Sequence, residues 1–305
     1  MILKKKILIT GINGFLGSHM AKHLKSNFEV IGLEYSLENL HRIASENFKV
    51  YSTNDTILDN IFKENDFYAV IHVATVYKRE SEPIFDLLNT NINLPVQLLE
   101  LSGKYKVNLF LNTDSFFNNP KYSYSYLSDY TLSKKHSLEW IKLLASSSSC
   151  KVVNMKVFHM FGENDAPGKF IPFIIKKIIS NEPTLDLTQG NQTRDFIYVK
   201  DVVFAFEHVI NFFIGFQGYQ EFEIGTGKSY TIKDFVTAIK EVTNSKTVLN
   251  FGGLAYREGE IMKSEVESFK LRDIGWKPKF NLKESLRCYI KNEFENFDQI
   301  LNARN

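Results

Sequence analysis

The chain has little excess charge of either sign. It carries 37 lysine and arginine residues against 35 aspartate and glutamate residues, which leaves a net charge of +2. No long block of one sign is present that could follow a polyanion. We therefore expect no nucleic-acid partner.

Cysteine is scarce and long apolar runs are missing. Cys150 and Cys288 lie far apart without the spacing of metal ligands, a pattern typical of packed thiols in a reducing compartment. No stretch approaches the roughly 18 apolar residues of a membrane-spanning helix, and the apolar run near the start already ends at Gly11. We expect a cytoplasmic protein with no metal site and no membrane association.

What the sequence does contain is an alternation of short apolar runs with longer segments of helical period. Such alternation predicts βαβ units and a parallel sheet that is covered on both faces. The strand candidates are Lys6–Thr10, Glu29–Leu33, Ala69–Val73, Leu109–Asn112 and Val152–Val157.

The pattern changes after Gly162, where the strict alternation stops. We expect helices at Ile232–Glu241 and Leu282–Glu293, with short strands at Asp195–Val199, Phe222–Ile224 and Val248–Phe251. The predicted fold class is α/β, a Rossmann-like doubly wound parallel sheet with a smaller discontinuous C-terminal substrate domain. The expected boundaries are 1–162 with about 194–213 for the dinucleotide-binding domain, and 163–193 with 214–305 for the substrate domain.

A glycine-rich segment follows the first predicted strand and opens a helix. Its residues are Gly11, Ile12, Asn13, Gly14, Phe15, Leu16 and Gly17. In this context the glycines allow a tight turn, a close approach of backbone amides to a pyrophosphate, and close packing of helix on strand. The segment predicts a bound dinucleotide, and the backbone of Val73 and Ala74 is expected to line its adenine side.

An acidic residue stands at the end of the second predicted strand. Glu34 lies roughly twenty residues after the glycines, where a carboxylate can accept hydrogen bonds from an adenosine ribose. Its negative charge favours NAD over NADP, and the nearest arginine is Arg42. A solvated carboxylate at a helix start is the alternative interpretation.

Tyr130 and Lys134 are one helical turn apart and therefore lie on one helix face. No other tyrosine of the chain has a lysine four residues later. A neighbouring cation stabilises a phenolate, so this spacing predicts that Lys134 lowers the pKa of Tyr130 for acid–base chemistry. Thr113 lies just beyond a predicted strand, where its hydroxyl can bind a substrate oxygen.

The glycine loop, Thr113 and the Tyr130/Lys134 pair, in this order, resemble the extended short-chain dehydrogenase/reductases, that is, the NAD-dependent epimerase/dehydratase family. The resemblance implies that Tyr130 exchanges a proton with a sugar hydroxyl or ketone, that Lys134 also holds the nicotinamide ribose, and that Thr113 orients the sugar oxygen. It also implies cofactor contacts at Asn91. The substrate contacts it implies are Thr75, Asp114, Ser115, His159, Lys169, Arg194 and Arg257, of which the two arginines grip the diphosphate.

Two departures from the family pattern bear on the reaction. Ser115 stands where a sugar 4,6-dehydratase carries a glutamate, which makes dehydration doubtful. His159 replaces a common asparagine, either as a substrate contact or as a packed loop histidine. Several stretches are similar to the CDP-paratose and CDP-abequose synthases, which implies NAD(P)H-dependent reduction of a 4-keto-deoxysugar nucleotide in surface polysaccharide synthesis. This resemblance favours NADPH, whereas Glu34 favours NADH.

Two other functions stay open on this evidence. A 4-epimerase that retains NAD would use the same Thr113, Tyr130 and Lys134, and Glu34 favours it. The other is a protein that binds the cofactor without catalysing a reaction. The resemblance also implies a homodimer, formed as a four-helix bundle by helices predicted at Pro83–Leu101 and Tyr130–Ala145.

Overall fold

A computed structural model describes residues 3–77, 82–122, 127–295, 297–302 and 304. Contacts divide the chain into two compact units. Unit 1 comprises 1–157, 203–223 and 270–276, and unit 2 comprises 158–202, 224–269 and 277–305. In the described part of the chain, no helix is long and apolar enough to cross a membrane.

Unit 1 is built around one sheet in the order β10-β6-β5-β4-β1-β2-β3. The strands from β6 to β3 run parallel, which confirms the predicted α/β, Rossmann-like class. The strands are β1 (Lys6–Thr10), β2 (Glu29–Glu34), β3 (Lys49–Ser52), β4 (Phe67–His72), β5 (Leu109–Ser115), β6 (Lys151–Val157) and β10 (Tyr219–Ile224).

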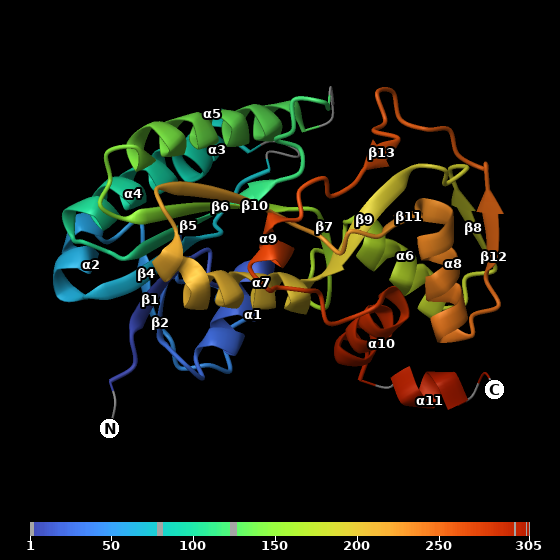
Figure 1. The fold of residues 1–305 in the computed structure, drawn as a ribbon. Helices are drawn as coiled ribbons and strands as arrows, with labels where there is room; N and C mark the ends of the chain where they lie inside the picture. Colours follow the sequence, from blue (N-terminus) through green and yellow to red (C-terminus); the bar gives the residue numbers. More distant parts are fainter. Residues whose placement is uncertain (1–2, 78–81, 123–126, 296, 303, 305) are drawn as a thin grey trace. The chain divides into compact units, whose positions relative to one another are not determined.

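Helices cover both faces of this sheet (Figure 1). The α4 and α5 helices lie on one face, and α1 and α7 lie on the other. The apolar runs of the strands are fully buried because both faces are covered, as Ile7, Leu8 and Ile9 illustrate. The helices are α1 (Phe15–Leu24), α2 (Leu58–Glu64), α3 (Ile84–Leu88), the π-helical turn η1 (Asn89–Asn93), α4 (Leu94–Lys104), α5 (Ser128–Ala145), α7 (Val199–Phe212), the 3₁₀ turn η2 (Phe213–Gly215) and α9 (Lys270–Asp273).

Unit 2 contains two small sheets and its own helices. In one sheet β9 pairs with β7, β11 and β13, and in the other β8 pairs with β12. The elements are β7 (His159–Phe161), α6 (Phe170–Ile179), β8 (Thr184–Leu187), β9 (Thr193–Tyr198), β11 (Ser229–Thr231), α8 (Ile232–Thr243), β12 (Val248–Phe251), β13 (Lys263–Ser264), α10 (Leu282–Glu293) and α11 (Phe297–Asn302).

The observed boundaries of the units differ from the predicted ones: the first segment of unit 1 ends at 157 rather than 162, its return covers 203–223 rather than about 194–213, and 270–276 also belongs to it. The chain was predicted to return to the first domain at about 194, but it returns at 203. The reason is that β9 pairs with strands of unit 2. The strand expected in the second domain near Phe222–Ile224 is β10, which pairs with β6 at the edge of the main sheet. The sequence around a strand does not indicate which distant strand it will pair with.

Candidate functional site

The glycine loop turns from β1 into α1 with almost no free space around its glycines. Gly11 has a φ of +62°, and a side chain there would lie 2.9 Å from the Cα of Ala74. A Cβ on Gly17 would lie 2.0 Å from the carbonyl oxygen of Gly11. Gly14 is the N-cap of α1 and contributes no side chain to cap it. This loop and helix start fit the pyrophosphate of a dinucleotide, because the backbone itself forms the wall.

Glu34 lies at the loop, as its position predicts. Its Oε1 accepts a hydrogen bond of 2.5 Å from the amide of Asn13. Burial raises the pKa of Glu34, while hydrogen bonds from backbone amides and the charge of Arg42 oppose that rise. The backbone amide of Arg42 donates to Asn13 Oδ1 at 2.9 Å, and its guanidinium donates to the Asn13 carbonyl at 3.4 Å. The arginine that seemed distant in sequence therefore reaches the loop.

The segment after β4 is held against β1. The hydroxyl of Thr10 accepts hydrogen bonds from the amides of Val73 and Ala74, each 3.1 Å long. It also lies 3.0 Å from Nδ1 of His72. Burial, and secondly the charge of Lys134, hold the pKa of His72 well below its usual range, so this ring is a neutral, packed group.

Tyr130 and Lys134 are buried on the face of α5 that meets the sheet, with exposed fractions of 4% and 5%. The ammonium of Lys134 donates to the Thr113 carbonyl at 2.9 Å and lies 6.0 Å from the centroid of the Tyr130 ring. Thr113 is within β5 rather than beyond it. Its hydroxyl is buried and makes no hydrogen bond within the described residues, so it can bind a ligand oxygen.

The predicted lowering of the Tyr130 pKa is not found in this structure, because burial of the phenol outweighs any effect of Lys134. Burial raises the pKa of Tyr130 well above its usual range, and Tyr77 adds to the rise. A hydrogen bond with Ser115 opposes it. Burial also lowers the pKa of Lys134 to about 8. The phenol is thus protonated at neutral pH, which suits a proton donor.

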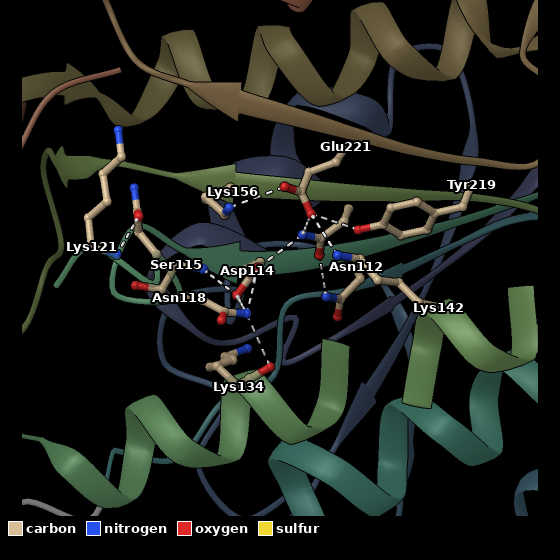
Figure 2. A network of polar contacts seen from close by, with 12 residues as sticks. Asn112, Asp114, Ser115, Asn118, Lys121, Lys134, Lys142, Lys156, Tyr219 and Glu221 are labelled. Carbon is tan, nitrogen blue, oxygen red and sulfur yellow. Dashed lines mark hydrogen bonds and ion pairs between the residues drawn. The ribbon is translucent and has the colours of Figure 1, made fainter. Parts of the chain in front are cut away.

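Asp114 lies beneath the site in a buried polar network (Figure 2). Its Oδ2 accepts hydrogen bonds from Asn154 at 2.9 Å and from Asn118 at 3.2 Å, and its Oδ1 accepts from the amide of Ser115 at 2.8 Å. Burial raises the pKa of Asp114. Both carboxylate oxygens are therefore occupied within the protein.

The network extends across the sheet to β10. Glu221 accepts a hydrogen bond from Asn154 at 3.1 Å and pairs with Lys156 at 3.2 Å. The hydroxyl of Tyr219 donates to the same carboxylate at 2.8 Å. Figure 2 shows these side chains converging between the strands. The polar groups at this end of the sheet thereby satisfy one another.

Three further residues at the site had no signal in the sequence analysis. Tyr77 stacks on the ring of Tyr130, and Asn118 also donates to the Lys134 carbonyl at 3.4 Å. Ser133 accepts a hydrogen bond from Asn91 at 2.9 Å, and Asn91 also accepts one from the Thr75 hydroxyl at 3.2 Å. An aromatic residue shortly after a strand or an asparagine in a loop is too common to mark a site without the fold.

Unit 2 holds the remaining predicted residues and brings two of them together. Arg194 is buried, and its guanidinium pairs with Glu260 at 2.6 Å. His159 Nε2 lies 3.0 Å from the hydroxyl of Ser264. Burial, and secondly the charge of Arg194, hold the pKa of His159 well below its usual range.

The other two predicted residues of unit 2 are Lys169 and Arg257. Lys169, at the N-cap of α6, pairs with Asp165 at 2.7 Å. Arg257 is exposed in the segment between β12 and β13. The structure therefore groups His159 with Arg194, and the carbonyl of Arg257 accepts a hydrogen bond of 3.3 Å from the amide of Glu260, the partner of Arg194.

Comparisons with known proteins agree with this architecture. The family model described as "NAD dependent epimerase/dehydratase family" matches residues 7–225. CDP-abequose synthase of Salmonella muenchen is 34% identical, over 93% of this chain and 97% of its own length. A putative UDP-glucose 4-epimerase of Methanocaldococcus jannaschii is 29% identical over 93% and 97%.

Solved structures share the fold. UDP-glucose 4-epimerase of Thermotoga maritima, solved with UDP-glucose, superposes with a TM-score of 0.80 at 23% identity and covers 94% of this chain and 97% of its own. dTDP-glucose 4,6-dehydratase of Bacillus anthracis, solved with NAD, has a TM-score of 0.78 at 18% identity and covers 99% and 100%.

Proposed function

The chain belongs to the NAD-dependent epimerase/dehydratase family of nucleotide-sugar enzymes, and we propose that it reduces C4 of a nucleotide-linked 4-keto-deoxysugar at the expense of NAD(P)H. A CDP-linked substrate is favoured because CDP-abequose synthases are among its relatives. The observation that carries the proposal is the phenol of Tyr130, buried on one helix face with Lys134, since reduction of a ketone requires a proton donor.

The residues of the proposed site have distinct roles in this reaction. Tyr130 gives its hydroxyl proton to the C4 oxygen, and the hydroxyl of Thr113 donates a hydrogen bond to the same oxygen. The ammonium of Lys134 donates a hydrogen bond to the backbone carbonyl of Thr113 and supplies positive charge beside the phenolate that forms. The bound nicotinamide, when reduced, supplies the hydride to C4. The product is a secondary alcohol.

The residues near Tyr130 disfavour a dehydration reaction. Elimination of water from a sugar needs further acid–base groups next to the substrate. In this chain Ser115 follows Asp114, and both oxygens of Asp114 already accept hydrogen bonds from the protein. A group so engaged is poorly placed to exchange a proton with a sugar.

We propose a corresponding role for unit 2 as the sugar-nucleotide domain. The buried guanidinium of Arg194 can pair with a diphosphate if Glu260 gives way, because a planar guanidinium matches phosphate oxygens well. The exposed guanidinium of Arg257 and the ammonium of Lys169 can add to it. His159, next to Arg194, lies where it could contact the same ligand.

The second candidate is a 4-epimerase that keeps NAD bound. Its specific support is Glu34, whose carboxylate lies at the glycine loop where an NAD ribose would need it. The two candidates differ in stoichiometry, since an epimerase consumes no cofactor overall.

The decisive experiment is a matrix of CDP-, GDP-, dTDP- and UDP-linked 4-keto-deoxysugars against NADH and NADPH. Loss of nicotinamide absorbance with one CDP-sugar is the expected result. Tyr130→Phe should reduce kcat by about 10²–10⁴-fold and leave cofactor affinity intact. A protein that purifies with bound NAD and interconverts sugars without net redox change would instead be an epimerase. Oxidation of cofactor with none of the ketosugars would refute the proposal.

We also propose that the enzyme is a homodimer. Helix α5 exposes Leu132, Trp140 and Leu143, with exposed fractions of 54%, 51% and 61%, and α3 exposes Phe85 at 70%. Large apolar side chains on two neighbouring helices fit the same surface of a second copy, as in a four-helix bundle. Light scattering should give twice the chain mass, and a monomer at micromolar concentration would refute this arrangement.

A further inference from the structure

A second tyrosine stacks against the ring of Tyr130. The ring centroids of Tyr77 and Tyr130 are 4.5 Å apart and the planes are inclined by 27°. Phe117 meets the same ring edge-on, with a centroid distance of 6.3 Å and an angle of 86°. Aromatic pairs favour these stacked and edge-to-face arrangements. The orientation of the Tyr130 ring is therefore restrained by two neighbours from different segments.

Asn91 fixes Tyr77 and Tyr130 relative to each other. It is fully buried, accepts a hydrogen bond from the amide of Val76 at 2.9 Å, and donates to the Val76 carbonyl at 2.8 Å. Its amide also donates to Ser133 at 2.9 Å, and Ser133 donates to the Tyr130 carbonyl at 2.8 Å. One buried amide thus holds both the residue before Tyr77 and the first turn of α5.

The two phenols also interact through their hydroxyls. Burial raises the pKa of Tyr130 most, and the negative charge that Tyr77 would carry as a phenolate and a hydrogen bond between the two side chains raise it further. The other groups that face Tyr130 are Asp114 and Ser115 from β5 and Lys134 from its own helix. Asp114 acts in the same direction as Tyr77, and Ser115 opposes it.

We propose that Tyr77 is a positioning residue of the reaction, whose stacked ring and hydroxyl hold the phenol of Tyr130 in the orientation from which it donates its proton. This rests on the proposed reduction. In that step the O–H bond of Tyr130 breaks, its proton bonds to the carbonyl oxygen, and the carbonyl carbon gains the hydride of the reduced nicotinamide. The phenolate then regains a proton from solvent. Tyr77 loses no proton in the cycle.

Two variants separate the hydroxyl of Tyr77 from its ring. Tyr77→Phe keeps the stacked ring and removes the hydroxyl, whereas Tyr77→Leu removes both. Tyr105→Phe is the matched control, because it also deletes a hydrogen-bonded phenol hydroxyl, one that donates to Asp59 at 3.0 Å away from the site. Thermal melting of all variants establishes that each is folded before any comparison is made.

The primary measurement does not depend on turnover. In protein labelled with ¹³C at tyrosine Cζ, Tyr130→Phe identifies the Tyr130 signal, and its chemical shift is followed with rising pH. We expect Tyr130 to begin ionising at lower pH in Tyr77→Phe than in wild type or Tyr105→Phe. If the signal titrates no earlier in Tyr77→Phe, the proposal is overturned.

Kinetics give the second readout. In Tyr77→Phe the basic limb of the kcat/KM profile should move to lower pH, with about a tenfold loss for each pH unit of displacement, while the Kd of the reduced cofactor is unchanged. Tyr77→Leu should lose kcat further, because its ring restraint is gone. An unmoved limb would contradict the role of the hydroxyl. If wild type oxidises no cofactor with any ketosugar, the proposed function fails, and the titration of Tyr130 still decides the role of Tyr77.

Discussion

Lys134→Met should abolish turnover and yet stabilise the protein at neutral pH. The ammonium of Lys134 is buried, and burial lowers its pKa from 10.5 to about 8. A difference of this size corresponds to about 3 kcal/mol of unfavourable free energy for holding the charge in the folded state. Methionine fills a similar volume without a charge, so this cost disappears.

Two losses reduce that gain. Methionine cannot donate to the Thr113 carbonyl, a bond of 2.9 Å worth about 1 kcal/mol. Asp114 also loses a nearby cation, although Lys156 and three hydrogen-bond donors remain near it. From a cost of about 3 kcal/mol for the charge and a loss of about 1 kcal/mol with the hydrogen bond, we expect a net gain of about 2 kcal/mol in the free energy of unfolding at pH 7.

The pH dependence provides a second test of the same reasoning. Because the pKa of Lys134 is lower in the folded than in the unfolded state, the unfolded chain binds this proton more tightly between about pH 8 and 10.5. The free energy of unfolding of the wild type should therefore rise through that interval relative to Lys134→Met. The advantage of the variant is full below pH 8 and vanishes towards pH 10.5.

Urea denaturation of cofactor-free protein at pH 7, 8.5 and 10 measures these differences. The control is Lys135→Met, which makes the same change at the exposed neighbouring position and should alter stability by less than about 0.5 kcal/mol. A Lys134→Met variant less stable than wild type at pH 7 would show that the lysine contributes to folding stability. The absence of any pH dependence in the difference would refute the assigned pKa.

Two other substitutions test the cofactor site. Gly17→Ala should weaken NADH binding at least about tenfold, because its Cβ would lie 2.0 Å from the Gly11 carbonyl oxygen; Gly215→Ala, with no neighbour within 4 Å, is the control, and equal affinity in a fluorescence titration would contradict the fit. Glu34→Gln should raise affinity for NADPH relative to NADH by about tenfold, since it removes a negative charge that a 2′-phosphate would meet. An unchanged ratio of the two dissociation constants would mean that Glu34 does not select the cofactor.

The sequence alone determined the elements whose information is local. The apolar runs predict the parallel strands because a sheet covered on both faces needs continuous apolar residues, and all five predicted strands are present. The glycine spacing predicts the loop because no side chain fits at Gly17. The spacing of Tyr130 and Lys134 predicts a shared helix face because one turn separates them.

Only the tertiary structure decided properties that depend on burial and on distant segments. The pKa of Tyr130 follows from its burial and from Tyr77, 53 positions earlier in the chain, rather than from the adjacent Lys134. Arg42 reaches the glycine loop through Asn13, and β10 joins the main sheet at β6. Sequence separation gives no measure of such contacts, because the chain folds back on itself, and the local dielectric surroundings of a group exist only once the core has formed.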